Sequence, residues 1–164
     1  MKLFKLSPSL LLAVSLLSVM GGCATYPEVS YYEPAVISGN VQMATLVGSR
    51  VKTTWPLDDE TTWPLAIDGQ PVRGRKDAFA TTVPLAPGLR TIQVALTQGS
   101  FFGQVAFKVD VKPGAQLVAK SVMQGQRFAA MWIEDQASGQ LISDKSIIGI
   151  QAPQATFIPI FIGR

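Results

Sequence analysis

The sequence predicts an all-β protein, a single antiparallel β-sandwich, and three observations lead to that prediction. Glycine and proline are frequent, at 14 and 11 residues, while charged residues make up only 15% of the chain. Apolar and polar residues alternate along several short runs, as in strands with one buried face. Asp-Gly, Pro-Gly and Ser-Gly pairs punctuate these runs as turns. With 164 residues, 48% of them hydrophobic, the chain can form one domain with a real core.

Four runs are the expected strands. Residues 105–111 alternate most clearly, and residues 91–96 and 79–85 follow the same period. Residues 127–134, RFAAMWIE, are apolar on both faces and are expected to form a central strand. The expected turns are Asp68-Gly69, Pro87-Gly88, Pro113-Gly114 and Ser138-Gly139.

A weak internal repeat relates residues 83–96 to residues 109–122 at a spacing of 26. Each copy has an apolar strand, a Pro-Gly turn and a second apolar strand, so the repeat predicts two hairpins. Residues 99–103, GSFFG, lack the spacing and the lysine of a phosphate-binding loop and are expected to connect a further hairpin.

The N-terminus reads as a targeting segment. Lys2 and Lys5 precede LLLAVSLLSVM at 10–20, an uncharged apolar run of 11 residues. A bilayer span needs about 20 apolar residues. The run is therefore too short to span a membrane and suits the hydrophobic region of a secretory signal.

The residues that follow, VMGGC at 19–23, resemble the lipobox of bacterial lipoproteins, although Met20 stands where that class usually has leucine. The resemblance implies cleavage before Cys23, the only cysteine of the chain, and acylation of that residue. Ala24 follows, and in the enterobacterial sorting pattern a residue other than aspartate there implies the outer membrane, usually its periplasmic face. Surface export and an ordinary signal peptide with a free thiol are the alternatives.

These readings divide the chain into four parts. Residues 1–22 are the expected signal peptide, and residues 23–40 the lipidated N-terminus with a flexible tether. Residues 41–150 are the expected β-sandwich, and residues 151–164 an apolar C-terminal strap. Tyrosines in the tether are expected either to lie at the lipid headgroups or to pack on the domain.

The stretch from IDGQPV at 67–72 through LAPGLRTIQV and VKPGAQLVAK to MWIED at 131–135 is similar to a recurrent type of small bacterial envelope β-sandwich. The resemblance covers about 70 residues and consists of strands and turns. It implies the fold and the compartment, and it transfers no catalytic residue, because such domains are usually accessory modules.

An eight-residue doublet, TTWPLDDE followed by TTWPLAID at 53–68, contains two of the three tryptophans, Trp55 and Trp63. A proline after each tryptophan favours edge strands or strand ends. We therefore expect a hairpin whose solvated turn is Asp58 to Glu60. The alternatives are paired exposed tryptophans that grip a glycan or peptide, and an acidic calcium loop, which adjacent carboxylates on extended chain do not favour.

Several chemistries are excluded or disfavoured. The chain has no histidine, so the common histidine-dependent catalytic triads and dyads cannot form. Neither Lys120-Ser121 nor Lys145-Ser146 belongs to a recognisable Ser-Lys motif, and no cofactor or metal is expected. Removing Lys2 and Lys5 from the 14 basic residues leaves 12 against 11 acidic ones, which disfavours nucleic acid as a partner.

The last residues, QAPQATFIPIFIGR at 151–164, crowd five large apolar side chains around Pro159, including Phe157 and Phe161. We expect them to close the sandwich as a strap, and the alternative is a segment that binds a partner's sheet edge.

The sequence therefore predicts a membrane-anchored, non-catalytic accessory or binding module of the cell envelope. The alternatives are a glycan-binding or enzyme-inhibiting module that uses Trp55 and Trp63, and, less favoured, an enzyme of unknown type.

Overall fold

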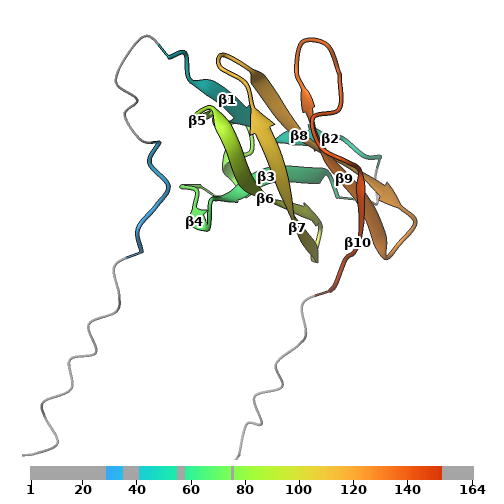
Figure 1. Ribbon diagram of the computed structural model, residues 1–164. Helices are drawn as coiled ribbons and strands as arrows, with labels where there is room; N and C mark the ends of the chain where they lie inside the picture. Colours follow the sequence, from blue (N-terminus) through green and yellow to red (C-terminus); the bar gives the residue numbers. More distant parts are fainter. Residues whose placement is uncertain (1–28, 35–40, 55–57, 75, 153–164) are drawn as a thin grey trace, which may run out of the picture.

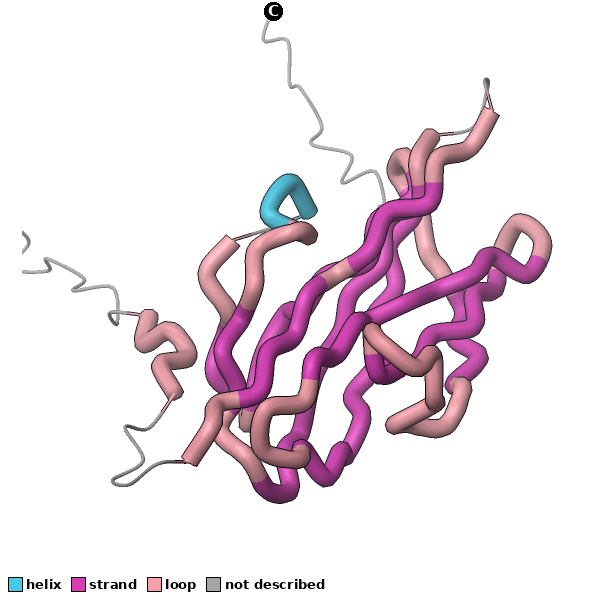
Figure 2. The backbone as a smooth tube through the Cα atoms, turned by 90° about the horizontal axis from the view of Figure 1, so that it is seen from above, coloured by secondary structure: helices cyan, strands magenta, loops and turns pink. Residues whose placement is uncertain are grey.

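The structure is a computed structural model that describes residues 29–34, 41–54, 58–74 and 76–152. In these residues, ten strands form two packed, mostly antiparallel sheets (Figure 1), which confirms the predicted all-β sandwich. One short 3-10 turn, Lys76–Ala78, lies at the periphery of the strands (Figure 2). No described residue belongs to a helix of the length and apolarity that crossing a bilayer requires.

Sheet A has the strand order β10-β9-β8-β1-β5. Its central pair, β1 and β8, is parallel, whereas its other pairs are antiparallel. Residues 127–134 were expected to form a central strand, and β9 does lie between two neighbours. The strands are β1 (Ala44–Val47), β5 (Val83–Leu85), β8 (Gln116–Gln124), β9 (Phe128–Asp135) and β10 (Ser146–Gly149).

Sheet B has the order β2-β3-β6-β7, and the short β4 pairs with the end of β3. Its longest hairpin joins β6 and β7 through Gly99 and Ser100, so the predicted role of residues 99–103 is confirmed. Asp68 and Gly69 both have positive φ, which suits the tight turn between β3 and β4. The strands are β2 (Ser49–Val51), β3 (Glu60–Ile67), β4 (Gln70–Pro71), β6 (Gly88–Gln98) and β7 (Phe101–Val111).

The core lies between the two sheets, where the inward-facing residues of each alternating strand meet. Full burial of a large aliphatic side chain contributes about 1.5–3 kcal/mol, so this layer supplies most of the favourable free energy of folding. Its fully buried members include Leu46, Leu85, Leu117, Met131 and Ile133 from sheet A and Ile67, Ile92, Val94, Leu96 and Val109 from sheet B.

The repeated Pro-Gly segments are not hairpins, and this prediction was wrong. Strands β5 and β6 belong to different sheets, and so do β7 and β8, so each Pro-Gly corner carries the chain across the core. Arg90 fixes the first corner by donating to the carbonyl oxygens of Ala86 at 2.9 Å and Pro87 at 3.1 Å. An alternating pattern indicates that a strand has one buried face. Strands in either sheet of a sandwich show this pattern, so it does not identify which strands pair.

Two further expectations need correction. Of residues 79–85, only Val83–Leu85 form a strand, because Thr81 N–H donates to the carbonyl of Ala78 at 2.9 Å and the chain turns there. Pro64 was expected at an edge or strand end, but it lies inside β3. The pairing of β3 with β6 has a bulge directly after Pro64. On the other edge of β3, Pro64 falls between the residues that pair with β2 and those that pair with β4, so its missing N–H interrupts neither pairing.

The two ends of the described chain are attached to the sandwich. Tyr32, within the expected tether, packs against the core, and its N–H donates to the carbonyl of Pro71 at 2.8 Å. Gln151, the first residue of the expected strap, exchanges two backbone hydrogen bonds of 3.0 Å with Phe102. These contacts place residues 29–34 beside β4 and residue 151 beside the start of β7 (Figure 1).

Candidate functional site

Most of the predicted site residues lie outside the described part of the chain. Cys23, Trp55, Phe157 and Phe161 belong to this group, so their predicted roles stay predictions. Trp63 is the one member that the structure places.

The two copies of the doublet differ in structure. The second copy lies in β3, which pairs with β2, a strand that precedes the first copy. The prediction that the two copies form the two strands of one hairpin was therefore wrong. Thr53 instead lies in the connection, where its hydroxyl donates to the carbonyl of Asp58 at 2.8 Å. Asp58 is exposed, as predicted for a turn, whereas Glu60 is buried, so its predicted place in the turn was wrong.

Trp63 lies on the outer face of sheet B, because its neighbours Thr62 and Pro64 align with the core residues Leu96 and Val94. Trp63 is nevertheless only 8% exposed. The Phe102 ring lies 6.3 Å away, centroid to centroid, at an interplanar angle of 53°. This tilted geometry is favourable for aromatic pairs.

Beside this pair is an apolar hollow of about 460 Å³. Trp63 and Phe102 supply its aromatic surface, and Leu65 and Thr97 lie next to them. The segment that follows β4 closes the other side through Gly74, Lys76 and Asp77.

A charged hollow of about 600 Å³ adjoins the apolar one, and Lys76 and Asp77 line both. Its remaining wall is formed by Arg50, Asp58, Asp59, Thr61 and Gly99. We call the two hollows together the sheet B groove.

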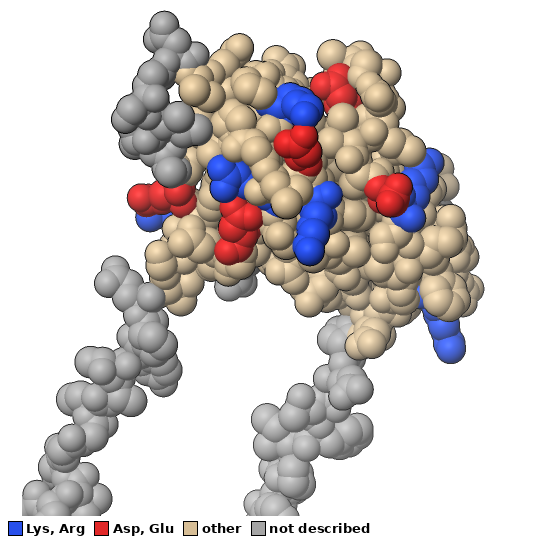
Figure 3. Space-filling view, in the orientation of Figure 1, with Lys and Arg blue, Asp and Glu red and all other residues tan. Residues whose placement is uncertain are grey.

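Arg50 in the groove has two side-chain contacts. Its guanidinium carbon lies 4.4 Å from the centroid of the Phe79 ring, and Nε donates to the Thr61 hydroxyl at 3.3 Å. Among the described residues, three carboxylates and two cations therefore surround one concave surface that continues into an aromatic floor. Lysine, arginine and carboxylate side chains are likewise intermingled on the face drawn in Figure 3. Such a groove fits a ligand that has an apolar part and a charged part.

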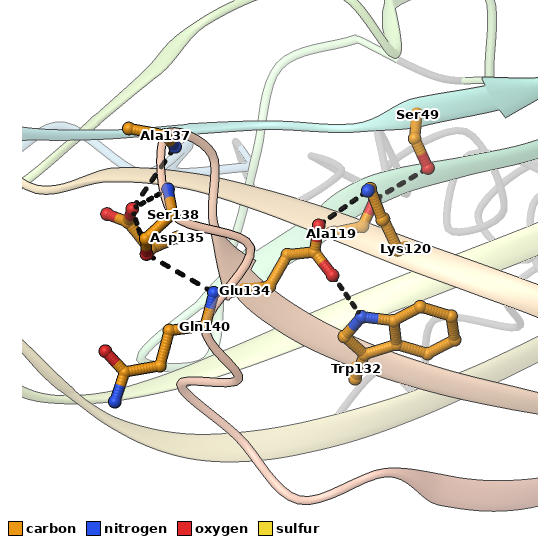
Figure 4. A network of polar contacts seen from close by, with 9 residues as sticks. All are labelled: Ser49, Ala119, Lys120, Trp132, Glu134, Asp135, Ala137, Ser138 and Gln140. Carbon is orange, nitrogen blue, oxygen red and sulfur yellow. Dashed lines mark hydrogen bonds and ion pairs between the residues drawn. The ribbon is translucent and has the colours of Figure 1, made fainter.

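The outer face of sheet A has a second polar network, drawn in Figure 4. Glu134 Oε1 pairs with Lys120 Nζ at 2.5 Å, and Glu134 Oε2 accepts from Trp132 Nε1 at 2.7 Å. Lys145 Nζ lies 4.5 Å from the centroid of the Trp132 ring. Burial alone would raise the pKa of Glu134, but the hydrogen bonds from Lys120 and Trp132 and the charges of both lysines lower it overall.

Asp135 follows Glu134, and its carboxylate points into the turn after β9 (Figure 4). It accepts the backbone N–H of Ser138 at 2.8 Å and the Ser138 hydroxyl at 2.7 Å. These bonds, with a smaller one from the Ala137 N–H, hold the pKa of Asp135 below its ordinary value. Both carboxylates thus have structural partners and do not face each other.

Ser121 lies on the opposite side of β8 from Lys120. It is buried between the sheets, where its hydroxyl donates to Glu60 Oε1 and also bonds the Thr62 hydroxyl. Met123 N–H donates to Glu60 Oε2 at 3.2 Å. Lys120 and Ser121 therefore form no catalytic pair, and the buried carboxylate links the two sheets.

Sequence reasoning missed Phe102, Arg50 and Asp77 as members of one surface. They come from three separate segments, and only the pairing of the strands brings them together. Among the described residues, no group of three or more acidic or cysteine side chains is arranged to hold a metal ion. No protein-family model, curated protein or solved structure gives a significant match to this chain.

Proposed function

We propose that this chain is a lipid-anchored, non-catalytic module of the bacterial outer membrane that binds an envelope partner through the sheet B groove. The observation that carries the binding half of the proposal is the groove itself, in which an aromatic hollow continues into a charged one. The anchoring half depends on Cys23, the only cysteine, placed directly after a lysine-led apolar run.

The groove favours a protein or peptide partner. An apolar side chain of the partner fits beside Trp63 and Phe102, and a neighbouring cationic group fits beside Asp58 or Asp77. The glycan interpretation required exposed tryptophan rings, and Trp63 exposes only 8% of its surface. The peptide interpretation is therefore the better supported of the two.

Anchoring needs a covalent change at Cys23. Several acyl chains, at about 0.8 kcal/mol per buried CH₂, hold a protein on a bilayer where a single chain does not. Mass spectrometry of the mature protein should find Cys23 as the first residue with the added mass of lipid. Cys23→Ala should block this processing, and a mature N-terminus elsewhere with a free thiol would refute the anchor.

Partner binding is tested in intact cells with a photo-crosslinking amino acid at Thr97, which lines the groove. The control position is Val122, which is 48% exposed on β8 in the other sheet. We expect a protein adduct from position 97 that is absent or weaker from position 122. Strong adducts from position 122 alone would assign binding to sheet A and overturn the proposed site.

A further inference from the structure

The segment 29–34 is docked on the domain although it lies within the expected tether. Tyr32 is partly buried against the core, and its N–H donates to the carbonyl of Pro71 in β4 at 2.8 Å. Its neighbours point outward, since Val29 is 57% exposed and Tyr31 is 41% exposed. The packing of Tyr32 and its backbone hydrogen bond thus hold this segment on the β4 side of sheet B.

The docked segment and β4 create a surface with an aromatic ring and both signs of charge. The Arg73 guanidinium carbon lies 5.3 Å from the centroid of the Tyr31 ring, and Arg73 Nη2 lies 3.8 Å from Glu33 Oε1. Both charged side chains are at least 75% exposed and thus free to meet a ligand. We call this the Tyr31 surface, a hollow of about 430 Å³ lined by Val29, Ser30, Tyr31, Glu33, Gln70 and Arg73.

The chain length between Cys23 and this surface is short. Six residue steps separate Cys23 from Val29, and at about 3.5 Å per residue they reach at most about 20 Å. If the tether were not docked and ran as far as Val41, its 18 steps from Cys23 would reach about 60 Å. Docking of residues 29–34 therefore cuts the reach of the tether to about a third.

We propose that the docked segment holds the lipidated domain against the bilayer, with the Tyr31 surface facing the lipid headgroups. This inference rests on the proposed anchor at Cys23. Aromatic rings with a polar tip, such as Tyr31, are favoured at headgroup level. Arg73 can meet a lipid phosphate and Glu33 a lipid amine, so the surface complements zwitterionic headgroups and does not require anionic lipid.

The orientation is tested with the full-length, lipidated protein in vesicles of phosphatidylethanolamine and phosphatidylcholine. A photo-crosslinking amino acid replaces Tyr31 in one sample and Ile147 in another. Ile147 is a matched control, because it is 64% exposed and lies on β10 at the edge of the other sheet. We expect lipid adducts from position 31 and few from position 147. Equal yields, or a higher yield from position 147, would overturn the orientation.

A second variant leaves the folded domain untouched. Twelve glycine and serine residues are inserted between Ala24 and Thr25, which lengthens the link from six steps to 18. Because effective concentration falls roughly as the −3/2 power of linker length, we expect the lipid yield at position 31 to fall about five-fold. An unchanged yield would show that the short link does not set the orientation.

Two readouts separate the possible failures. Mass spectrometry of the same sample reports whether Cys23 is acylated, so the loss of the anchor is distinguished from the wrong orientation of an anchored domain. Vesicles that contain about a fifth phosphatidylglycerol test the headgroup assignment by charge complementarity. We expect similar yields with and without this anionic lipid, and a strict requirement for it would refute the zwitterionic assignment.

Discussion

Glu60, Thr62 and Ser121 form a buried cluster of polar side chains between the sheets. Replacing Ser121 by alanine should destabilise the sandwich more than removal of the Thr62 hydroxyl. The Ser121 hydroxyl is buried between the sheets and is shared by the Glu60 carboxylate and the Thr62 hydroxyl. Its removal leaves Glu60 with only the Met123 N–H, at 3.2 Å, among its protein donors in the described chain, and leaves the Thr62 hydroxyl without its partner.

The size of the effect follows from these two losses. A hydrogen bond to a charged group contributes about 1.5–3 kcal/mol, and a buried hydroxyl left unpaired costs about 1–3 kcal/mol. Allowing for relaxation, we expect Ser121→Ala to lower the free energy of unfolding by about 2–4 kcal/mol. A domain of about 110 residues has an unfolding entropy near 0.23 kcal/mol per kelvin, so the melting temperature should fall by about 9–17 °C.

Thr62→Val is the matched comparison, because it removes a hydroxyl of the same cluster and keeps the volume of the side chain. Ser121 can still donate to Glu60 in this variant, so we expect a loss of only about 0.5–1.5 kcal/mol. Ser100→Ala, in the exposed β6–β7 turn, should change stability by less than about 0.5 kcal/mol. Calorimetry of the unlipidated mature chain measures all three, and a Ser121→Ala loss no larger than that of Thr62→Val would refute the reasoning.

Three further predictions concern other parts of the fold. Folding lowers the pKa of Glu134 from its ordinary value of 4.5. Its ion pair therefore stabilises the folded protein at pH values above 4.5, and this stabilisation is lost as the pH falls through the pKa of the folded state. The difference in the free energy of unfolding between the wild type and Glu134→Gln, measured with denaturant, should therefore shrink as the pH is lowered below 4.5. A difference that does not change with pH would contradict the prediction. Gly48→Ala should lower the free energy of unfolding by several kcal/mol, because the added Cβ would meet the carbonyl oxygen of Thr62 and lie 2.8 Å from that of Phe79. Gly149→Ala is the control, since no atom lies within 4 Å of its added Cβ, and equal melting temperatures of the two variants would refute the prediction. Deleting residues 156–164 should lower the melting temperature or cause aggregation, and unchanged stability with a lost envelope partner would recast them as a binding segment.

Local patterns predicted most of the expected strands, because a strand must bury one face, or both faces where it is central. The alternation in residues 105–111 reappears in β7, and the apolar run at 127–134 reappears in β9. Turn chemistry was equally reliable where it is local, as at Asp68-Gly69, where both residues adopt positive φ.

The pairing of strands and the candidate site could not be predicted in the same way. Pro87-Gly88 serves a tight turn and a corner between sheets equally well, so the sequence cannot tell which strands it joins. Glu60 was interpreted as part of a solvated turn because two aspartates precede it, and only the packing of β3 against β8 across the core reveals its buried partner Ser121. The sheet B groove likewise depends on contacts between segments that are distant in the sequence.

The parallel pair in sheet A constrains the order in which the domain can assemble. Thr45 aligns with Gln116 and Val47 with Val118, so the first strand waits for a partner about 70 residues further along the chain. A chain that emerges N-terminus first, from a ribosome or across a membrane, leaves the β8-facing edge of β1 unsatisfied until that partner arrives. Such distant contacts slow folding and expose strand edges to chaperones or to aggregation. Sheet B, whose strands end at Val111, can form before that point, whereas sheet A is completed only by the last three described strands, β8, β9 and β10.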